Sequence, residues 1–160
     1  MLKHSLLWVR RAKKISYPLR VEKMNKLIDK MNKALGWELR AINMYAHYAA
    51  NIKGIHRLQL SPLFNTEMTE SVAHADIVRK AIIQLGGIPV TERDAHPITH
   101  TNDYVEMLNH SLDTEIEASK VYSEVLIMVE ESNEEDLKDA LEQIYLSELR
   151  SVEEFRLLVG

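Results

Sequence analysis

The chain has no cysteine among its 160 residues. This absence excludes disulfide bonds, thiolate metal sites and cysteine nucleophiles, and it leaves the redox compartment undetermined. The sequence also lacks an apolar run long enough to span a membrane. It shows no strand pattern, internal repeat or low-complexity segment. We therefore expect an all-α protein, mainly one domain with a substantial core, in the cytoplasm.

Acidic side chains are missing from residues 1–20, which we define as the basic N-terminal segment. The segment carries six lysines and arginines, with Trp8 in a short apolar run. That run is shorter than the core of a secretory signal, and no small-residue cleavage site follows it. Four interpretations stay open: a transit peptide, a helix on a membrane surface, an arm that binds nucleic acid, or a helix or arm that docks on a partner or on the protein's own oligomer.

The remainder of the chain, residues 21–160, is clearly acidic, because the whole chain has a formal net charge of −4 despite its basic start. An acidic body argues against nucleic acid as its main partner. We expect this part to fold as the bundle described below.

One stretch, residues 65–76, combines a helical pattern with ionisable side chains. Steps of three and four residues place one set on a single helix face: Leu60, Phe64, Glu67, Ser71, His74, Val78, Ala81 and Leu85. Both ends of this face are apolar, while its middle carries a carboxylate, a hydroxyl and an imidazole. Ionisable groups within an apolar stripe are unfavourable unless they are paired or bound to a metal.

The helical period continues on both sides of this stretch and predicts four long helices. The aperiodic residues between the second and third helices predict a long loop, which needs a structural reason in a compact domain. The expected helices run from Val21 to about Gly54, from Arg57 to Leu85, from an N-cap at Asn102 to about Glu131, and from a capping box of Ser132 and Glu135 to the end of the chain.

Each expected helix carries one ionisable residue near the middle of its apolar stripe: Glu38, His74, Glu115 and Glu148. Facing carboxylates in a core repel one another, so their pKa values rise or they require a cation. Oxygen ligands with one imidazole suit iron, manganese or zinc. The pattern therefore predicts a metal site. The alternative is a set of protonated or hydrogen-bonded core acids.

Four segments together resemble the helices of a bacterioferritin, within the ferritin-like superfamily. They are WELRAINMYAHY, ESVAHADIVRKAIIQLGGIP, YVEMLNHSLDTEIEA and YLSELRSVEEF. The resemblance implies a four-helix bundle with a long crossover between the second and third helices. It also implies iron oxidation and storage in a hollow oligomer, although the fifth helix of the family is missing.

The resemblance assigns roles to individual residues. Glu38 and Glu115 match the lone carboxylates of the first and third helices. Tyr45 falls where bacterioferritins carry a tyrosine beside the iron pair. The haem of the family is held by a methionine at the position of Val72, so we predict no haem.

Two ligands of the family pattern are replaced. His74 and Glu148 match Glu-x-x-His residues of the second and fourth helices, but Ser71 stands where the bridging glutamate belongs, and Ser151 replaces a histidine. Glu38, His74 and Glu148 still suffice for one metal ion. Glu70, one turn before His74, is a possible substitute ligand. We expect non-haem iron, one or two ions, with weak or partial ferroxidase activity.

Other polar residues have ordinary interpretations. Glu67 is either an acid that helps mineral form or part of a solvated face. His96 and His100 in the crossover are most simply exposed loop histidines, although they are able to bind a metal weakly. Tyr45 and Tyr122 lie on the stripes that face the site, where packing plus a hydrogen bond to a carboxylate is the simplest role.

The resemblance implies a homo-oligomer, from a dimer to a hollow shell, that stores iron or removes free iron. One alternative is a non-catalytic subunit that assembles with another ferritin-like subunit. A second is a scaffold bundle that contacts a partner or a membrane through the basic N-terminal segment.

Overall fold

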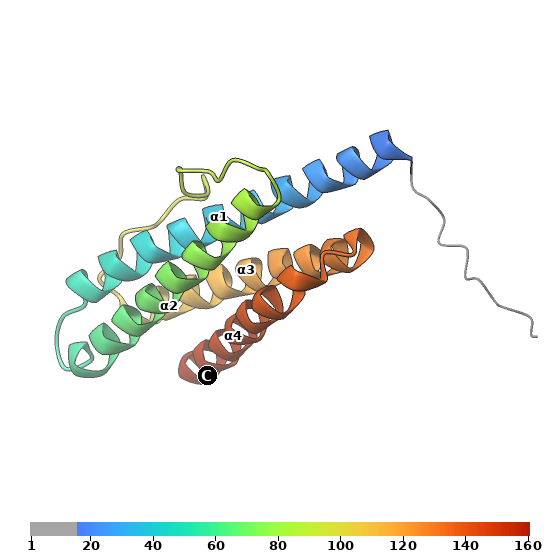
Figure 1. Cartoon of the computed structure of the whole chain (residues 1–160). Helices are drawn as coiled ribbons and strands as arrows, with labels where there is room; N and C mark the ends of the chain where they lie inside the picture. The colour runs from blue at the N-terminus through green and yellow to red at the C-terminus, as the bar shows by residue number, and fades with distance from the viewer. Residues whose placement is uncertain (1–15) are drawn as a thin grey trace, which may run out of the picture.

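The computed structural model describes residues 16–160, which form an all-α bundle of four helices, as predicted (Figure 1). The helices are α1 (Tyr17–Asn51), α2 (Arg57–Gln84), α3 (Tyr104–Ser132) and α4 (Glu135–Val159). Helix α1 packs along both α2 and α3, and α3 packs along α4, whereas α2 and α4 meet over a shorter stretch. Residues 85–103 form the crossover, which runs back along the bundle, so that α3 begins near the end where α2 begins (Figure 1). None of the described helices has the length and apolarity needed to cross a bilayer.

The first helix begins at Tyr17 rather than at Val21. Pro18 lies in its first turn, where the missing N–H of proline leaves no hydrogen bond unmade. The fixed φ angle of proline suits this first turn, so the helix starts four residues earlier than the sequence pattern predicted. The expectation that this segment docks or is helical falls mainly on residues 1–15, which lie outside the described part of the chain.

Two predicted caps differ in the structure. Helix α3 is capped by Asp103, whose side chain accepts hydrogen bonds from the N–H groups of Val105 and Glu106, and not by the neighbouring Asn102. The capping box of Ser132 and Glu135 is wrong, because the Ser132 hydroxyl donates to the Met128 carbonyl inside α3 instead. Serine in a last helical turn is able to satisfy a carbonyl four residues back, and this local bond competes with capping.

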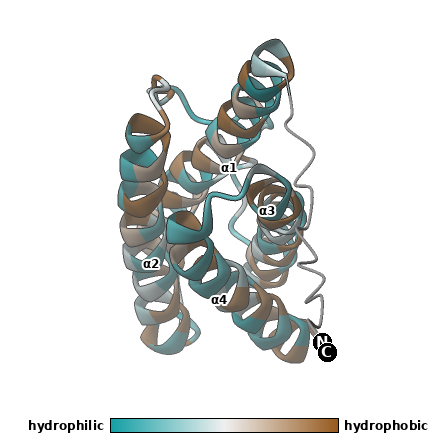
Figure 2. Ribbon diagram, turned by 45° about the vertical axis from the view of Figure 1, so that its right-hand side comes forward, coloured by the Kyte–Doolittle hydropathy of each residue, from teal (hydrophilic) through white to brown (hydrophobic). Residues whose placement is uncertain are grey.

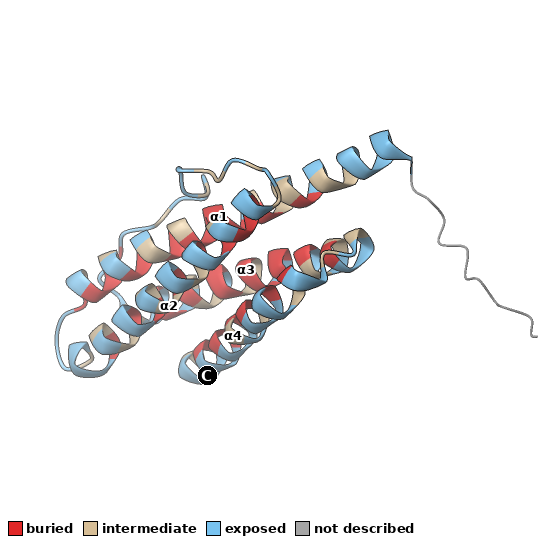
Figure 3. Ribbon diagram, in the orientation of Figure 1, coloured by how far each residue is buried: buried red, intermediate tan, exposed pale blue. Residues whose placement is uncertain are grey.

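The core consists of the apolar stripes of the four helices, which all face inward (Figures 2 and 3). One cluster lies towards the start of α1 and includes Leu27, Leu35 and Ile82; a second lies towards its end and includes Phe64 and Phe155. The predicted ionisable residues of α1, α3 and α4 lie between these two apolar regions. The surrounding core shields them from water, which strengthens every electrostatic interaction among them.

The crossover is held on α1 by hydrogen bonds along its length. The Asp94 N–H donates to the Gly36 carbonyl at 2.8 Å, and the Tyr48 hydroxyl donates to the Thr99 carbonyl at 3.0 Å. The buried Arg40 donates from Nε and Nη2 to the carbonyls of His96 and Pro97, at 3.0 and 2.7 Å. The crossover is therefore an ordered segment, and several of its backbone groups form hydrogen bonds with α1.

Replacing Arg40 by Met is expected to lower the free energy of unfolding by about 2–4 kcal/mol, because charged hydrogen bonds to two part-buried carbonyls are lost. Urea denaturation measures the change. Arg93→Met is the matched control, since Arg93 is exposed and bonds only to carbonyls of its own loop; we expect it to cost less than about 0.5 kcal/mol. An equal loss of unfolding free energy in both variants would contradict the conclusion that Arg40 holds the crossover on α1.

Candidate metal centre

The four predicted site residues each come from a different helix and converge on the bundle axis. Glu38 lies on α1, His74 on α2, Glu115 on α3 and Glu148 on α4. The three glutamates are only 2%, 4% and 4% exposed, in chain order. Their helices place them there because each residue continues an apolar stripe, and the stripe is the face that the helix buries.

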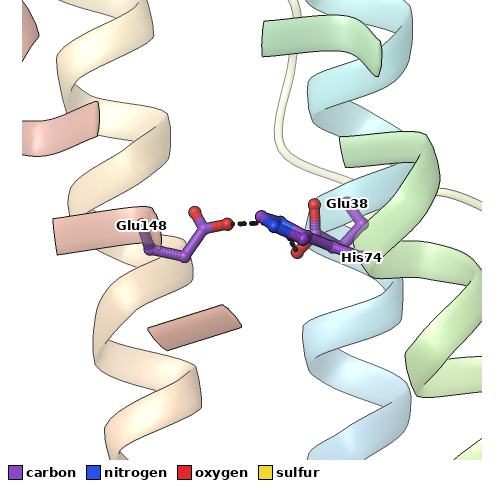
Figure 4. A group of neighbouring side chains, drawn as sticks. All are labelled: Glu38, His74 and Glu148. Atoms are coloured by element: carbon purple, nitrogen blue, oxygen red, sulfur yellow. Dashed lines mark ion pairs between the residues drawn. The ribbon is translucent and has the colours of Figure 1, made fainter. Parts of the chain in front are cut away.

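Three of these side chains form one compact group. His74 Nδ1 lies 2.9 Å from a carboxylate oxygen of Glu148 and 3.4 Å from one of Glu38. One ligand atom from each residue lies within 4.8 Å of the others, and Figure 4 shows the imidazole between the two carboxylates. Within residues 16–160 this is the one such group of three metal-ligating side chains.

Two buried tyrosines orient the carboxylates, as predicted from their stripe positions. The Tyr122 hydroxyl donates to Glu38 at 2.6 Å, and the Tyr45 hydroxyl donates to Glu115. Burial, together with the nearby carboxylates, raises the pKa of both tyrosines well above 10.0. Both phenols therefore stay protonated at neutral pH and act as fixed hydrogen-bond donors.

The acids are costly to ionise without a cation. Burial raises the pKa of Glu115 well above 4.5, and the adjacent Glu148 raises it further. Burial, and then the charge of Glu38, also raises the pKa of Glu148. At His74, burial lowers the pKa, but the hydrogen bond and charge of Glu38 outweigh it, and the net pKa rises above 6.5. The site thus retains protons that a bound cation would displace.

At the two positions where the family pattern has further ligands, the side chains of Ser71 and Ser151 are packed in the core. Ser71 and Ser151 are both buried, and the Ser151 hydroxyl donates to Glu67 at 3.0 Å. Burial raises the pKa of Glu67. Glu67 is therefore a buried neighbour of the site and not part of a solvated face, and sequence spacing alone left this open.

Glu70 lies away from the compact group. Its carboxylate accepts hydrogen bonds from Arg150, at 3.0 Å, and from the Ser147 hydroxyl, at 3.2 Å. Since its side chain is 34% exposed and already paired on the α2–α4 surface, it is not brought to His74 as a ligand in this structure. The crossover histidine His96 is likewise engaged elsewhere, with Nδ1 2.6 Å from Asp94.

The donor set fits one divalent cation better than two. Glu38, His74 and Glu148 offer two carboxylates and an imidazole, and His74 Nδ1 lies against carboxylate oxygens of both glutamates. Glu115 adjoins Glu148 and is able to serve as a further oxygen ligand. Because Ser71 and Ser151 supply no charge, no second carboxylate–histidine set completes the other half of the centre. Mixed oxygen and nitrogen ligands suit iron(II), manganese(II) or zinc(II).

Comparisons with known proteins agree with this geometry. The family model described as Ferritin-like domain matches residues 28–160. A crystal structure of a ferritin-like, diiron-carboxylate protein from Bacillus anthracis str. Ames is similar over 91% of this chain and 100% of its own, with 30% sequence identity and a TM-score of 0.82.

Proposed function

The chain belongs to the ferritin-like domain family, and from this premise we propose that it binds iron(II) at Glu38, His74 and Glu148 and takes part in iron storage or detoxification. The observation that carries the proposal is the convergence of these three buried ligands from three helices. Iron(II) held there would be the substrate, and each ion would give one electron to dioxygen as it became iron(III), which is the chemistry of a ferroxidase.

The side chains around the proposed site determine how tightly iron(II) binds and how fast it is oxidised. Glu38 and Glu148 provide negative charge in a site shielded from water, and the Tyr122 hydroxyl holds Glu38 in place at 2.6 Å. His74, positioned between the carboxylates, must give up its extra proton to become a ligand. The neutral Ser71 is too short to bridge two cations. We propose a bacterioferritin-like site with one strong iron position and weak or partial ferroxidase activity.

Anaerobic titration with iron(II) tests this proposal. We expect about one tightly bound ion per chain, and we expect His74→Gln to weaken its binding by about tenfold or more, because the only nitrogen ligand is lost. Adding dioxygen to the loaded protein then measures slow oxidation above the buffer rate. His56→Gln is the matched control, since His56 stacks on Tyr104 at 3.9 Å in the α1–α2 turn. No bound iron and no oxidation above buffer would overturn the proposal.

A second candidate function rests on the same two serines. A chain with Ser71 and Ser151 in place of ligands suits a subunit that contributes surface to a mixed shell while a competent ferritin-like partner oxidises the iron. Exposed apolar residues on α2, including Leu58 at 74% and Ile83 at 62%, offer contact area for a homo-oligomer or a mixed one. Co-purification in mixed shells supports this candidate, and full activity of the protein alone argues against it.

A further inference from the structure

Two histidines outside the candidate metal centre face each other across the α1–crossover contact. His47 Nε2, on α1, lies 2.9 Å from Nδ1 of His100, which belongs to the crossover. The two rings meet edge to face, with centroids 5.2 Å apart. His100 is exposed and His47 is partly exposed, so water and dissolved ions reach the pair. Neither residue takes part in the candidate metal centre, which lies in the bundle core.

The backbone on both sides of this pair is held in place. Next to His47, the Tyr48 hydroxyl donates to the carbonyl of Thr99, the residue before His100, at 3.0 Å. Asn51 anchors the His47 side, because its Nδ2 donates to the His47 carbonyl at 2.7 Å. Little chain entropy is therefore lost when the two imidazoles bind a common ligand, and such preorganisation strengthens chelation.

The distance between the two nitrogens suits a shared metal ion. Two imidazole ligands of a tetrahedral zinc ion, each about 2.0–2.1 Å from the metal, stand about 3.3–3.4 Å apart. At the observed separation of 2.9 Å, the two nitrogens must move apart by a few tenths of an ångström, and the rings must turn so that both lone pairs point at the ion. We propose that His47 and His100 form a two-histidine surface site for a divalent transition metal of the zinc class, and that the bound metal fastens the crossover to α1.

The protonation of the two imidazole rings is compatible with metal binding. With Asn51 Nδ2 as the donor to His47 Nδ1 at 3.4 Å, the neutral tautomer that fits has the proton on Nε2 of His47, which then donates a hydrogen bond to Nδ1 of His100. When a metal takes the lone pair at Nε2, this proton moves to Nδ1, where water reaches the partly exposed ring, and Asn51 keeps its hydrogen bond to the His47 carbonyl. Water fills the remaining metal positions. Imidazole ligands favour zinc, nickel and copper over hard cations such as magnesium.

Zinc(II) titration of the full chain tests the site, with the metal measured by competition with a chromophoric chelator. We expect His100→Gln to lose one zinc per chain, or to bind it about tenfold or more weakly, because a single exposed imidazole lacks the chelate advantage. Zinc is also expected to raise the melting temperature of the parent protein more than that of the variant, since only a metal bound by both histidines adds a further link between the crossover and α1. His96→Gln, in the same loop but paired with Asp94, is the control and is expected to keep the site.

A double-variant cycle separates chelation from unrelated zinc binding. His47→Gln and the double variant are both expected to match His100→Gln, because either imidazole alone fails to hold the ion. Unchanged zinc stoichiometry and affinity in the single variants would overturn the proposal, as would additive losses or an equal loss in His96→Gln. Zinc at the buried centre is counted in parallel with His74→Gln, which is expected to leave the surface site intact.

Discussion

Replacing Ser71 by Glu and Ser151 by His together is expected to raise the initial rate of iron(II) oxidation by about 10- to 100-fold, the size of effect that changes at metal-supporting residues commonly have. The pair of substitutions completes the Glu-x-x-His pattern on both α2 and α4 of a ferritin-like centre. A glutamate at position 71 adds the negative charge that lets two cations lie close together. A histidine at position 151 adds a nitrogen ligand on the side of Glu115. Stopped-flow absorbance after mixing loaded protein with dioxygen measures the rate.

The main obstacle to this gain is space. Ser71 and Ser151 are each 5% exposed, and the Ser151 hydroxyl bonds to Glu67, so Glu67 must turn away to admit a larger side chain. Ser71→Gln with Ser151→Asn is therefore the matched control, because it adds similar bulk without the charge or the imidazole. We expect this control to keep the parent rate. A completed variant that folds, binds two ions and still oxidises iron at the parent rate would show that the serines are not what limits the centre.

The positions of the four candidate ligands in the core were predictable, because the 3.6-residue period of a helix shows in the sequence which face the helix buries. Glu38, His74, Glu115 and Glu148 interrupt apolar stripes at matching depth, and the structure buries all three acids. The orientation of Tyr45 and Tyr122 towards carboxylates followed from the same stripes and is confirmed.

Contacts that depend on a distant or aperiodic partner were not predictable. Glu67 is buried because Ser151, 84 residues away in the sequence, supplies its hydrogen bond. Arg40 is buried because carbonyls of the crossover satisfy its guanidinium, and that segment has no period to reveal where it lies. Glu70 was a candidate ligand on helical spacing alone, and spacing does not reveal that Arg150 pairs with it.

Replacing Glu115 by Gln is expected to stabilise the metal-free protein by about 1–3 kcal/mol at pH 8 while weakening metal binding. The amide oxygen keeps the hydrogen bond from Tyr45, and the new amide N–H donates to Glu148, where two carboxyls now adjoin. The gain depends on pH. Because the folded-state pKa of Glu115 lies well above 4.5, the folded chain keeps a proton that the unfolded chain loses. In the parent protein, the contribution of protonated Glu115 to the free energy of unfolding is complete below pH 4.5 and is lost as pH rises towards the folded-state pKa.

Protonated His74 also stabilises the folded state, since its folded-state pKa is raised above 6.5. This stabilisation is lost as pH rises through the raised pKa, as it is for Glu115. Asp94 acts in the opposite direction, because its pKa is lowered from 3.8 and the folded state is therefore favoured as pH rises. This change in stability is complete by about pH 5, so it does not affect the range from pH 5 to pH 8. Metal-free parent protein should therefore become less stable from pH 5 to pH 8, by at most about 1.4 kcal/mol per pH unit for each proton. Urea denaturation at several pH values measures this slope.

The slope should be smaller in Glu115→Gln, and it should be unchanged in Glu117→Gln, a control on the same helix whose side chain is 46% exposed. Manganese(II) reverses the trend in the parent, because a bound cation replaces the protons and binds more tightly as pH rises. In Glu115→Gln this reversal should weaken together with metal affinity. If the metal-free parent became more stable between pH 5 and pH 8, the buried carboxyls would have to be ionised at no cost in the folded state, and the reason for a cation at the centre of the bundle would disappear.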